Sequence, residues 1–396
     1  MTLYAIVNCG SSSIKFRVLD IDSGKTLADG LVEGIGEASG KLRLKLPGGT
    51  TETAETIADH RAGLDRLFAE LRAAGVLDAG GLACIGHRVV HGGEAFTAPA
   101  LIDQDVLDGI RAQIPLAPLH NPANITGIEA AMAVAPDIPH VAVFDTAFHQ
   151  TMPPQAYRYA VPNALYDDLK VRRYGFHGTS HACVSRAAAE WLGIPLEAFN
   201  AVVLHLGNGA SVTAIEGGKS VDTSMGLTPL EGLMMGTRSG DIDPALPHFM
   251  ASNAGMSIGE IDTMLNRESG MKGICGDNDM RNVEARMEAG DEAARLAFDM
   301  FSHRARKYLG AYMALLGRVD AVVFTAGIGE NSPLLRAAIC DGLEPLGIAL
   351  DPARNKGRGG PKEISTDASR TKLLVIPTEE ELEIARQAKR CLEHAG

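Results

Sequence analysis

Two short turns of small residues, each flanked by apolar strand-like sequence, lie half a chain apart and constrain the fold most strongly. The first lies in AIVNCGSSSIKFRV (residues 5–18) and the second in AVVLHLGNGASVTAI (residues 201–215). Glycine permits both a sharp bend and close approach, and the backbone N–H groups of such a turn converge on an anion. The two turns therefore predict a duplicated fold that grips a polyphosphate from both sides, as in a nucleotide-dependent phosphotransferase.

Length and composition are those of an ordinary globular enzyme. At 396 residues, with 45% hydrophobic and 22% charged residues, the chain is long enough for two domains. Its net charge of −12 disfavours nucleic acid and anionic membranes as partners. We see no transmembrane stretch and no secretion signal, and the six scattered cysteines form no CxxC pair. We therefore expect a cytoplasmic protein with reduced thiols and without a structural zinc site.

The hydrophobic pattern alternates between strand-like and helix-like segments in both halves. The spacing predicts strands and helices, and the runs at 141–144 and 321–324 take comparable places in the two halves, which favours a duplication. Strands are expected over 3–8, 14–20, 41–46, 140–145, 201–206, 211–215 and 320–327, and 84–93 is expected to be a strand that runs into a glycine-rich loop. Helices are expected over about 55–74, 122–135, 181–191, 257–265 and 291–316. Asn121-Pro122 is typical of an N-cap followed by proline at the first helical position.

Standard phosphate loops are absent from the sequence. Gly217-Gly218-Lys219-Ser220 resembles part of a Walker A motif, but Thr213 stands where that motif needs its first glycine, so a hairpin turn is expected. GNGASV fails the dinucleotide fingerprint because Val212 replaces the third glycine. In AGIGENSP (326–333), glycines precede Ser332-Pro333, a predicted helix start, which favours a ligand beside that terminus. A plain connecting loop there, and a plain hairpin at 205–209, remain alternatives.

Several cations stand beside glycines or in loops of small residues. Arg88 ends a strand before His91-Gly92-Gly93, and Arg238 lies in GTRSGDIDP, so either suits a carboxylate or phosphate partner. Surface ion pairs are the alternative for both. His120 and His177 also lie in such loops, where a purely structural role is equally open. Thr179 or Ser180 is expected to cap the helix that follows His177.

Carboxylates complete the candidate set. Asp145 ends a buried strand, where open α/β sheets present catalytic groups. In IPTEEELEIA, Thr378 and Glu381 are spaced as a capping box, which leaves Glu380 available as an oxygen ligand for Mg²⁺. A merely solvated first helical turn is the alternative.

Taken together, the motifs resemble those of the acetate kinase family from about residue 3 to residue 387. They are NCGSSSIKF, GHRVVHGGE, PLHNPAN, VFDTAFH, RYGFHGTSH, HLGNGAS, DTSMGLTPLEGLMMGTRSGDIDP, AGIGENSP and IPTEEEL. The resemblance implies an α/β fold of two duplicated sugar kinase/Hsp70/actin-like (ribonuclease H-like) domains with a cleft between them. It implies domains over 1–149 plus 383–396 and over 150–382, and a homodimer. It also implies reversible phosphoryl transfer from ATP to acetate, giving ADP and acetyl phosphate, with Mg²⁺, for which Mn²⁺ can substitute.

The resemblance also assigns roles to matching positions. It implies metal ligation by Asn8 and Glu380, and catalytic roles for Arg88, His120, Asp145, His177 and Arg238. The nucleotide would contact Ser11, Ser13, Lys15, His205, Leu206, Gly207, Asn208, Gly209, Asp279, Met280, Arg281, Gly327, Ile328, Gly329, Glu330 and Asn331. The substrate methyl would lie among Val90, Leu119, Phe176 and Pro229, with Arg88 on its carboxylate.

Departures from the family pattern and rival functions narrow this expectation. Cys9 stands where alanine is usual, Glu379 replaces an asparagine and Asn278 replaces a common serine; none removes a catalytic group. A non-catalytic actin- or Hsp70-like switch would not need both arginines and a tight apolar pocket. A sugar kinase would need polar groups near the pocket. Propionate kinase remains the close competitor, since one methylene is worth only about 1–3 kcal/mol, and Val90 favours acetate.

Overall fold

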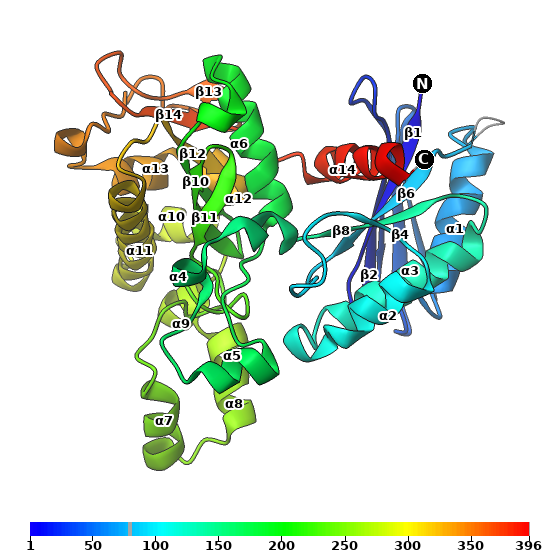
Figure 1. Ribbon diagram of the computed structural model, residues 1–396, viewed down its shortest axis with the longest axis horizontal. Helices are drawn as coiled ribbons and strands as arrows, with labels where there is room; N and C mark the ends of the chain where they lie inside the picture. The colour runs from blue at the N-terminus through cyan, green and yellow to red at the C-terminus, as the bar shows by residue number, and fades with distance from the viewer. Residues whose placement is uncertain (78–80, 396) are drawn as a thin grey trace. The chain divides into compact units, whose positions relative to one another are not determined.

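The computed structural model describes residues 1–77 and 81–395. The chain divides into two compact units, Met1–Phe148 with Glu379–Gly396 and His149–Thr378. Each unit is built around one mixed sheet with helices on its faces (Figure 1). The C-terminal helix thus returns to the first unit, so residues from both ends of the chain build that unit. None of the helices in the described ranges is long and apolar enough to cross a membrane.

The sheet of the first unit has eight strands in the order β5-β4-β3-β2-β1-β6-β8-β7. Alternate residues of β1 point to opposite faces, so Ala5 and Val7 join one core with helices α1 and α3, while Tyr4 and Ile6 join another with helix α14. The strands are β1 (Leu3–Cys9), β2 (Ser13–Asp20), β3 (Thr26–Glu33), β4 (Gly40–Leu46), β5 (Gly49–Glu55), β6 (Cys84–Val89), β7 (Ala100–Leu101) and β8 (His140–Phe144). The helices are α1 (His60–Ala73), α2 (Gln104–Ala112), α3 (Asn121–Val134) and α14 (Glu380–Ala395).

The sheet of the second unit has six strands in the order β11-β10-β9-β12-β14-β13. Helices α6 and α11 lie on opposite sides of it (Figure 1). The strands are β9 (Ala201–Leu206), β10 (Ala210–Glu216), β11 (Lys219–Thr223), β12 (Ala321–Thr325), β13 (Lys362–Glu363) and β14 (Lys372–Val375). The helices are α4 (Pro154–Tyr157), α5 (Asn163–Leu169), α6 (Gly178–Leu192), α7 (Leu246–Ala254), α8 (Ile258–Thr263), α9 (Gly270–Cys275), α10 (Met280–Glu288), α11 (Glu292–Leu316), α12 (Ala326–Asn331) and α13 (Pro333–Cys340).

The two sheets share one topology, which confirms the duplication predicted from the paired turns. In the first, β2 runs antiparallel to β1 and β3, and β1, β6 and β8 run parallel; in the second, β10 runs antiparallel to β9 and β11, and β9, β12 and β14 run parallel. Each sheet ends in a short antiparallel strand, β7 or β13. One equivalence expected from sequence is wrong. Strand β8, with residues 141–144, corresponds to β14, whereas β12, with residues 321–324, corresponds to β6, because β12 pairs directly with the strand that opens its unit.

Local signals give mixed results against the structure. Gly217-Gly218 forms the turn of the β10–β11 hairpin, which confirms the rejection of a Walker loop. Helix α1 begins later than expected, because 49–55 pairs with β4 as strand β5 and Asp59 then caps the helix through the N–H of Ala62. Helix α3 begins at Asn121 with His120 at the N-cap, one residue before the expected start. The Asn121 side chain instead accepts from the His91 N–H and donates to the His91 carbonyl.

Candidate active site

Three predicted site residues stand at the carboxyl ends of neighbouring parallel strands in the first unit. Val7 of β1 pairs with His87 of β6, so Asn8 lies level with Arg88. The N–H of Asp145, directly after β8, donates to the carbonyl of Val89. Because parallel strands end at one edge, the fold gathers Asn8, Arg88 and Asp145 there, as open α/β sheets do with functional groups.

Arg88 and Asp145 form a two-pronged ion pair at this edge. The Arg88 Nε–H donates to Asp145 Oδ1 at 3.1 Å and a terminal N–H donates to Oδ2 at 2.5 Å. The side chains are 20% and 3% exposed. Burial lowers the pKa of the Arg88 guanidinium, but Asp145 and Glu380 more than offset this, so the net shift is upward. The pair therefore fixes a permanently charged fork in one orientation.

Glu380, at the start of α14, joins Asp145 and Glu381 in a group of carboxylates. Burial raises the pKa of Glu380, Asp145 and Glu381 add to the rise, and Arg88 and Lys15 oppose it. The expected capping box of Thr378 and Glu381 is wrong. Glu381 forms an ion pair with Arg17 at 3.0 Å, and the Thr378 hydroxyl accepts from Ser180 at 2.8 Å. Long-range partners have replaced the local cap.

The serine-rich turn between β1 and β2 is a tight backbone loop. The Gly10 N–H donates to the Ser13 carbonyl at 2.9 Å, and the Gly10 carbonyl lies 2.8 Å from His60 Nε2. Ser11 at the tip is exposed. Lys15 is also exposed and pairs across the hairpin with Asn8. The loop is closed by backbone hydrogen bonds, and the exposed Ser11 hydroxyl and Lys15 ammonium group remain accessible to a ligand.

The remaining candidates of the first unit lie around helix α3. The Val90 N–H donates to Asn124 Oδ1, and Asn124 Nδ2 donates to the Cys9 carbonyl, so the amide of Asn124 ties the loop after β6 to the end of β1. His120 is the N-cap residue without a side-chain capping bond. Leu119 beside it is 63% exposed.

In the second unit, the turn at 207–209 is held by two segments distant in sequence. The Gly207 N–H donates to the Gly209 carbonyl at 3.1 Å, which closes the turn. The Asn208 carbonyl accepts from the N–H of Gly236, and its side-chain oxygen accepts from Asn278 at 3.0 Å. The departure at Asn278 thus has a structural role, because its amide holds the turn.

Gly209 lies against two predicted catalytic side chains. A Cβ at this position would meet His177 Nε2 at 3.2 Å and a terminal nitrogen of Arg238 at 3.4 Å. The His177 ring stacks on that of His205, with ring centres 4.2 Å apart. Arg238 donates to the Pro229 carbonyl at 3.4 Å, and burial lowers the pKa of its guanidinium. Across the ranges that the structure describes, no carboxylate hydrogen bonds to Arg238, so its charge is available to an anion.

His177 has the backbone conformation of a functional outlier. Its φ is +58°, in the left-handed region, and it is itself the N-cap of α6. The expected cap by Thr179 or Ser180 is wrong, since both lie inside the helix. The Ser180 hydroxyl instead lies 2.8 Å from His205 Nδ1. The buried Phe176 carbonyl accepts from His149 Nε2 at 3.0 Å, which fixes the segment before His177.

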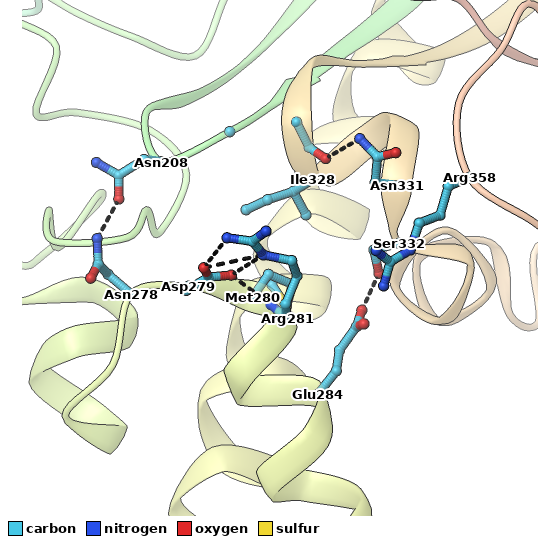
Figure 2. Close-up of a pocket in the computed structure, with 12 residues that line it drawn as sticks. Asn208, Asn278, Asp279, Met280, Arg281, Glu284, Ile328, Asn331, Ser332 and Arg358 are labelled. Carbon is cyan, nitrogen blue, oxygen red and sulfur yellow. Dashed lines mark hydrogen bonds and ion pairs between the residues drawn. The ribbon is translucent and has the colours of Figure 1, made fainter. Parts of the chain in front are cut away.

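A pocket of about 570 Å³ opens beside the second turn. Figure 2 shows Asn208 and Asn278 at one end and Ser332, Glu284 and Arg358 at the other, with Ile328 and Met280 between them. Asp279 and Arg281 form a two-pronged ion pair, at 2.5 Å in its shortest contact. Eight predicted nucleotide residues thus line one pocket, namely Gly207, Asn208, Asp279, Met280, Arg281, Gly327, Ile328 and Asn331. The predicted His205, Leu206, Gly209, Gly329 and Glu330 are not among its lining residues. AGIGEN forms the short helix α12 rather than a loop.

Three lining residues were missed by the sequence analysis. Glu284 accepts a hydrogen bond from the Ser332 hydroxyl, which also caps α13 through the N–H of Leu335. Arg358 lies in the exposed loop NKGRGG, where an arginine beside glycines meets the criterion that selected Arg238. That signal could have found Arg358. Nothing local marks Glu284 or assigns Ser332 more than a capping role.

Comparison with known proteins gives one consistent answer. The family model described as the acetokinase family matches residues 3–386. The chain is 55% identical to an acetate kinase of Streptomyces coelicolor, covering 100% of this chain and 98% of that protein. The crystal structure of Porphyromonas gingivalis acetate kinase matches with a TM-score of 0.95 at 41% identity, covering 99% of this chain and 100% of the other.

A propionate kinase structure from Francisella tularensis matches almost as well. Its TM-score is 0.92 at 44% identity, and the match covers 98% of this chain and 99% of the other. The overall likeness therefore does not distinguish between the two named activities. Both matches confirm the expected fold of two duplicated actin-like α/β domains. On the evidence of its sequence and its fold, the chain belongs to the acetokinase family.

Proposed function

We propose that the protein is an acetate kinase, which transfers the γ-phosphoryl group of ATP reversibly to the carboxylate of acetate and yields ADP and acetyl phosphate. The observation that carries this proposal is a pair of arginines. Arg88 is oriented by Asp145, and Arg238 has no hydrogen-bonded carboxylate among the described residues. The Arg88 guanidinium suits the carboxylate of acetate, and the Arg238 guanidinium suits the phosphoryl group that is being transferred.

The chemistry needs charge neutralisation more than proton transfer. A carboxylic acid with a pKa of about 4–5 is already ionised at neutral pH, so acetate needs no general base. The obstacle is repulsion between this anion and the polyphosphate tail. This repulsion is reduced by three side chains that face the two anionic reactants, namely Arg88, Arg238 and His177. The same side chains hold the reactants in line for attack of the carboxylate on the γ-phosphorus. Asp145 acts on Arg88 as an orienting group rather than as a base.

The nucleotide fits the pocket of the second unit. Its phosphates would lie against the turn at 207–209, where backbone N–H groups and Arg238 supply donors. Its base and ribose would lie between Ile328 and the Asp279–Arg281 pair. The serines of the first turn and Lys15 would contact the transferring phosphoryl group.

A divalent cation fits the oxygen ligands of the first unit. Burial raises the pKa of Glu380, and the negative charges of Asp145 and Glu381 add to the rise, so a bound cation would stabilise the ionised form of this carboxylate. Hard oxygen donors of this kind suit Mg²⁺ or Mn²⁺, with Asn8 and Glu380 as the ligands from the chain. When bound, the ion offsets phosphate charge and orients the phosphate oxygens. Glu379 adds negative charge next to this ligand.

Substrate choice is tested by the specificity constant kcat/KM for acetate, propionate and butyrate with ATP. We expect acetate to be preferred, since Val90 limits room beside Arg88. Val90→Ala should raise propionate relative to acetate by roughly 10–100-fold, the worth of one methylene. Val161→Ala, at an exposed position of the second unit, is the matched control and should leave the ratio unchanged. A propionate preference in the unaltered protein would favour the alternative, propionate kinase, which the Francisella match supports. If the protein binds ADP but forms no acyl phosphate from ATP and any of the three acids, the result would favour a non-catalytic nucleotide switch.

We further propose a homodimer in the cytoplasm. Exposed apolar side chains gather on α5, α7 and α8 of the second unit, among them Leu169 (63% exposed), Phe249 (61%) and Ile258 (73%). A patch of this kind is typical of a subunit interface. All six cysteines are unpaired, as in a reducing compartment. Light scattering should give twice the chain mass, and Phe249→Glu should give monomers.

A further inference from the structure

Arg336, on the first turn of α13, is a fully buried cation whose role the proposed chemistry does not explain. Its exposed fraction is 0%, and it is among the largest completely buried side chains of the described residues. Burial of a charge costs several kcal/mol unless hydrogen bonds and an opposite charge compensate for it. An apolar side chain would fill this space without the free-energy cost of burying a charge. The arginine is therefore expected to have a specific role.

Five N–H groups of the guanidinium are matched by five neutral oxygens. Nε donates to Asn355 Oδ1 at 2.8 Å, and one terminal nitrogen donates to the carbonyls of Gly329 and Glu330, both at 2.9 Å. The other donates to the carbonyls of Asn355 at 3.1 Å and Gly357 at 3.4 Å. Each donor of the planar fork therefore has an acceptor. Burial lowers the pKa of the group to about 10.

These acceptors belong to two separate walls of the pocket. Gly329 and Glu330 are part of α12, whose other residues Gly327, Ile328 and Asn331 line it. Asn355 and Gly357 lead directly to Arg358, which lines the pocket beside Ser332 (Figure 2). The Asn355 amide is itself oriented, because its Nδ2 donates to the Pro333 carbonyl at 2.9 Å.

We propose that Arg336 is a positioning residue for nucleotide binding: it ties α12 to the 355–358 loop, so that the two walls are held at a fixed separation before ADP or ATP enters. This inference rests on the proposed nucleotide role of the pocket. Only a planar fork with five donors can span both segments, because lysine offers three donors from one point. Glu284, which lines the same pocket, opposes the lowering of the pKa of Arg336, so a carboxylate partly offsets the buried charge.

The test measures equilibrium ADP binding by calorimetry, together with kcat and the KM for ATP and for acetate. Arg336→Lys should weaken ADP binding at least tenfold and raise the KM for ATP similarly, while the KM for acetate changes less than twofold. Arg306→Gln is the matched control. Arg306 donates to the carbonyls of Ala338 and Ile339 at the other end of the same helix, away from the pocket. The Arg306→Gln variant should have a lower unfolding temperature and an unchanged affinity for ADP.

Arg336→Lys that folds and binds ADP as tightly as the unaltered protein would overturn the inference. If Arg336→Lys does not fold, Asn355→Ala keeps the arginine and removes one acceptor and the Pro333 bond. Weaker ADP binding by this variant supports the positioning role of Arg336, and unchanged binding overturns it. Failure of the unaltered protein to bind ADP would instead refute the proposed function, so the two failures are distinct.

Discussion

Replacing Asp145 by asparagine is the sharpest test of the proposal that Asp145 orients Arg88 at the strand ends of the first unit. The shape of the side chain is kept, and one acceptor oxygen remains for Arg88. The second charge-assisted hydrogen bond, now at 2.5 Å, is lost, because the new amide N–H₂ would face a guanidinium donor. Arg88 then keeps its charge in a site where its side chain is only 20% exposed.

The magnitude follows from this geometry. Breaking one side of a buried ion pair costs roughly 3–5 kcal/mol. We expect about 3 kcal/mol, at the low end of that range, because Glu380 remains as a second anion near Arg88. If the transition state depends on the oriented fork, this loss reduces kcat/KM for acetate by about 150-fold. Substrate concentrations must extend well above the normal KM, so that kcat and KM are obtained separately.

Asp29→Asn is the matched control for this experiment. Asp29 also accepts from two N–H groups of Arg17, at 3.1 and 2.6 Å, although both bonds end on Oδ2, and the side chains are 42% and 31% exposed. A solvent-exposed pair contributes about 0–1 kcal/mol, so the rate should be nearly unchanged. An Asp145→Asn enzyme within about threefold of normal kcat/KM would refute the orienting role.

Three further outcomes follow from buried contacts. Gly127→Ala should destabilise the first unit by about 1–3 kcal/mol, because the new Cβ would overlap Cys9 Sγ and Cβ; chemical denaturation should show that adding Cys9→Gly restores more of the loss than adding Cys9→Ala, which keeps the Cβ. Burial lowers the pKa of His149 from 6.5 to about 4, so the unfolded state binds the proton more readily below pH 6.5. Urea unfolding should therefore show stability falling between pH 6.5 and 4, with His149 contributing about 3 kcal/mol of the loss, and level above that window; a constant midpoint there contradicts the assignment. Ser180→Ala removes the hydrogen bond to His205 at the end of β9 and should lower kcat several-fold, whereas Ser185→Ala, whose hydroxyl donates to the Ala182 carbonyl of its own helix, should not.

Sequence patterns predicted features that depend on a few adjacent residues. The hairpin at Gly217-Gly218 and the helix start at Ser332-Pro333 are confirmed, because turn and cap geometry is set locally. Helix α12 was not predicted, since the strand was expected to run over 320–327 and a plain loop was the alternative to a ligand site at 326–333. There, the carbonyls of Gly329 and Glu330 bond to the buried Arg336, a contact that no local pattern reveals.

Long-range partners account for the other errors. Thr378 and Glu381 are spaced as a capping box, yet each finds a stronger partner far away in sequence, Ser180 and Arg17 respectively. The pocket residues Glu284 and Arg358 were missed for the same reason, since they meet only when α10 and the 355–358 loop come together. The family motifs supplied the residues of the pocket that local patterns alone could not select.

The corrected alignment of the two sheets places different residues at equivalent positions beside the two turns. Asn8 lies level with Arg88 at the end of β6, and in the second sheet His205 pairs with Thr325 at the end of β12. At the same register, therefore, the first unit carries a guanidinium bound to a carboxylate, whereas the second carries a hydroxyl followed by the glycines of α12. A fixed charge favours a small carboxylate, for which one strong contact must suffice. Glycines and neutral donors favour a long phosphate chain, which makes many backbone contacts along its length. The duplicated turns thus share a strand arrangement, and the residues at the neighbouring strand ends differ between the two units.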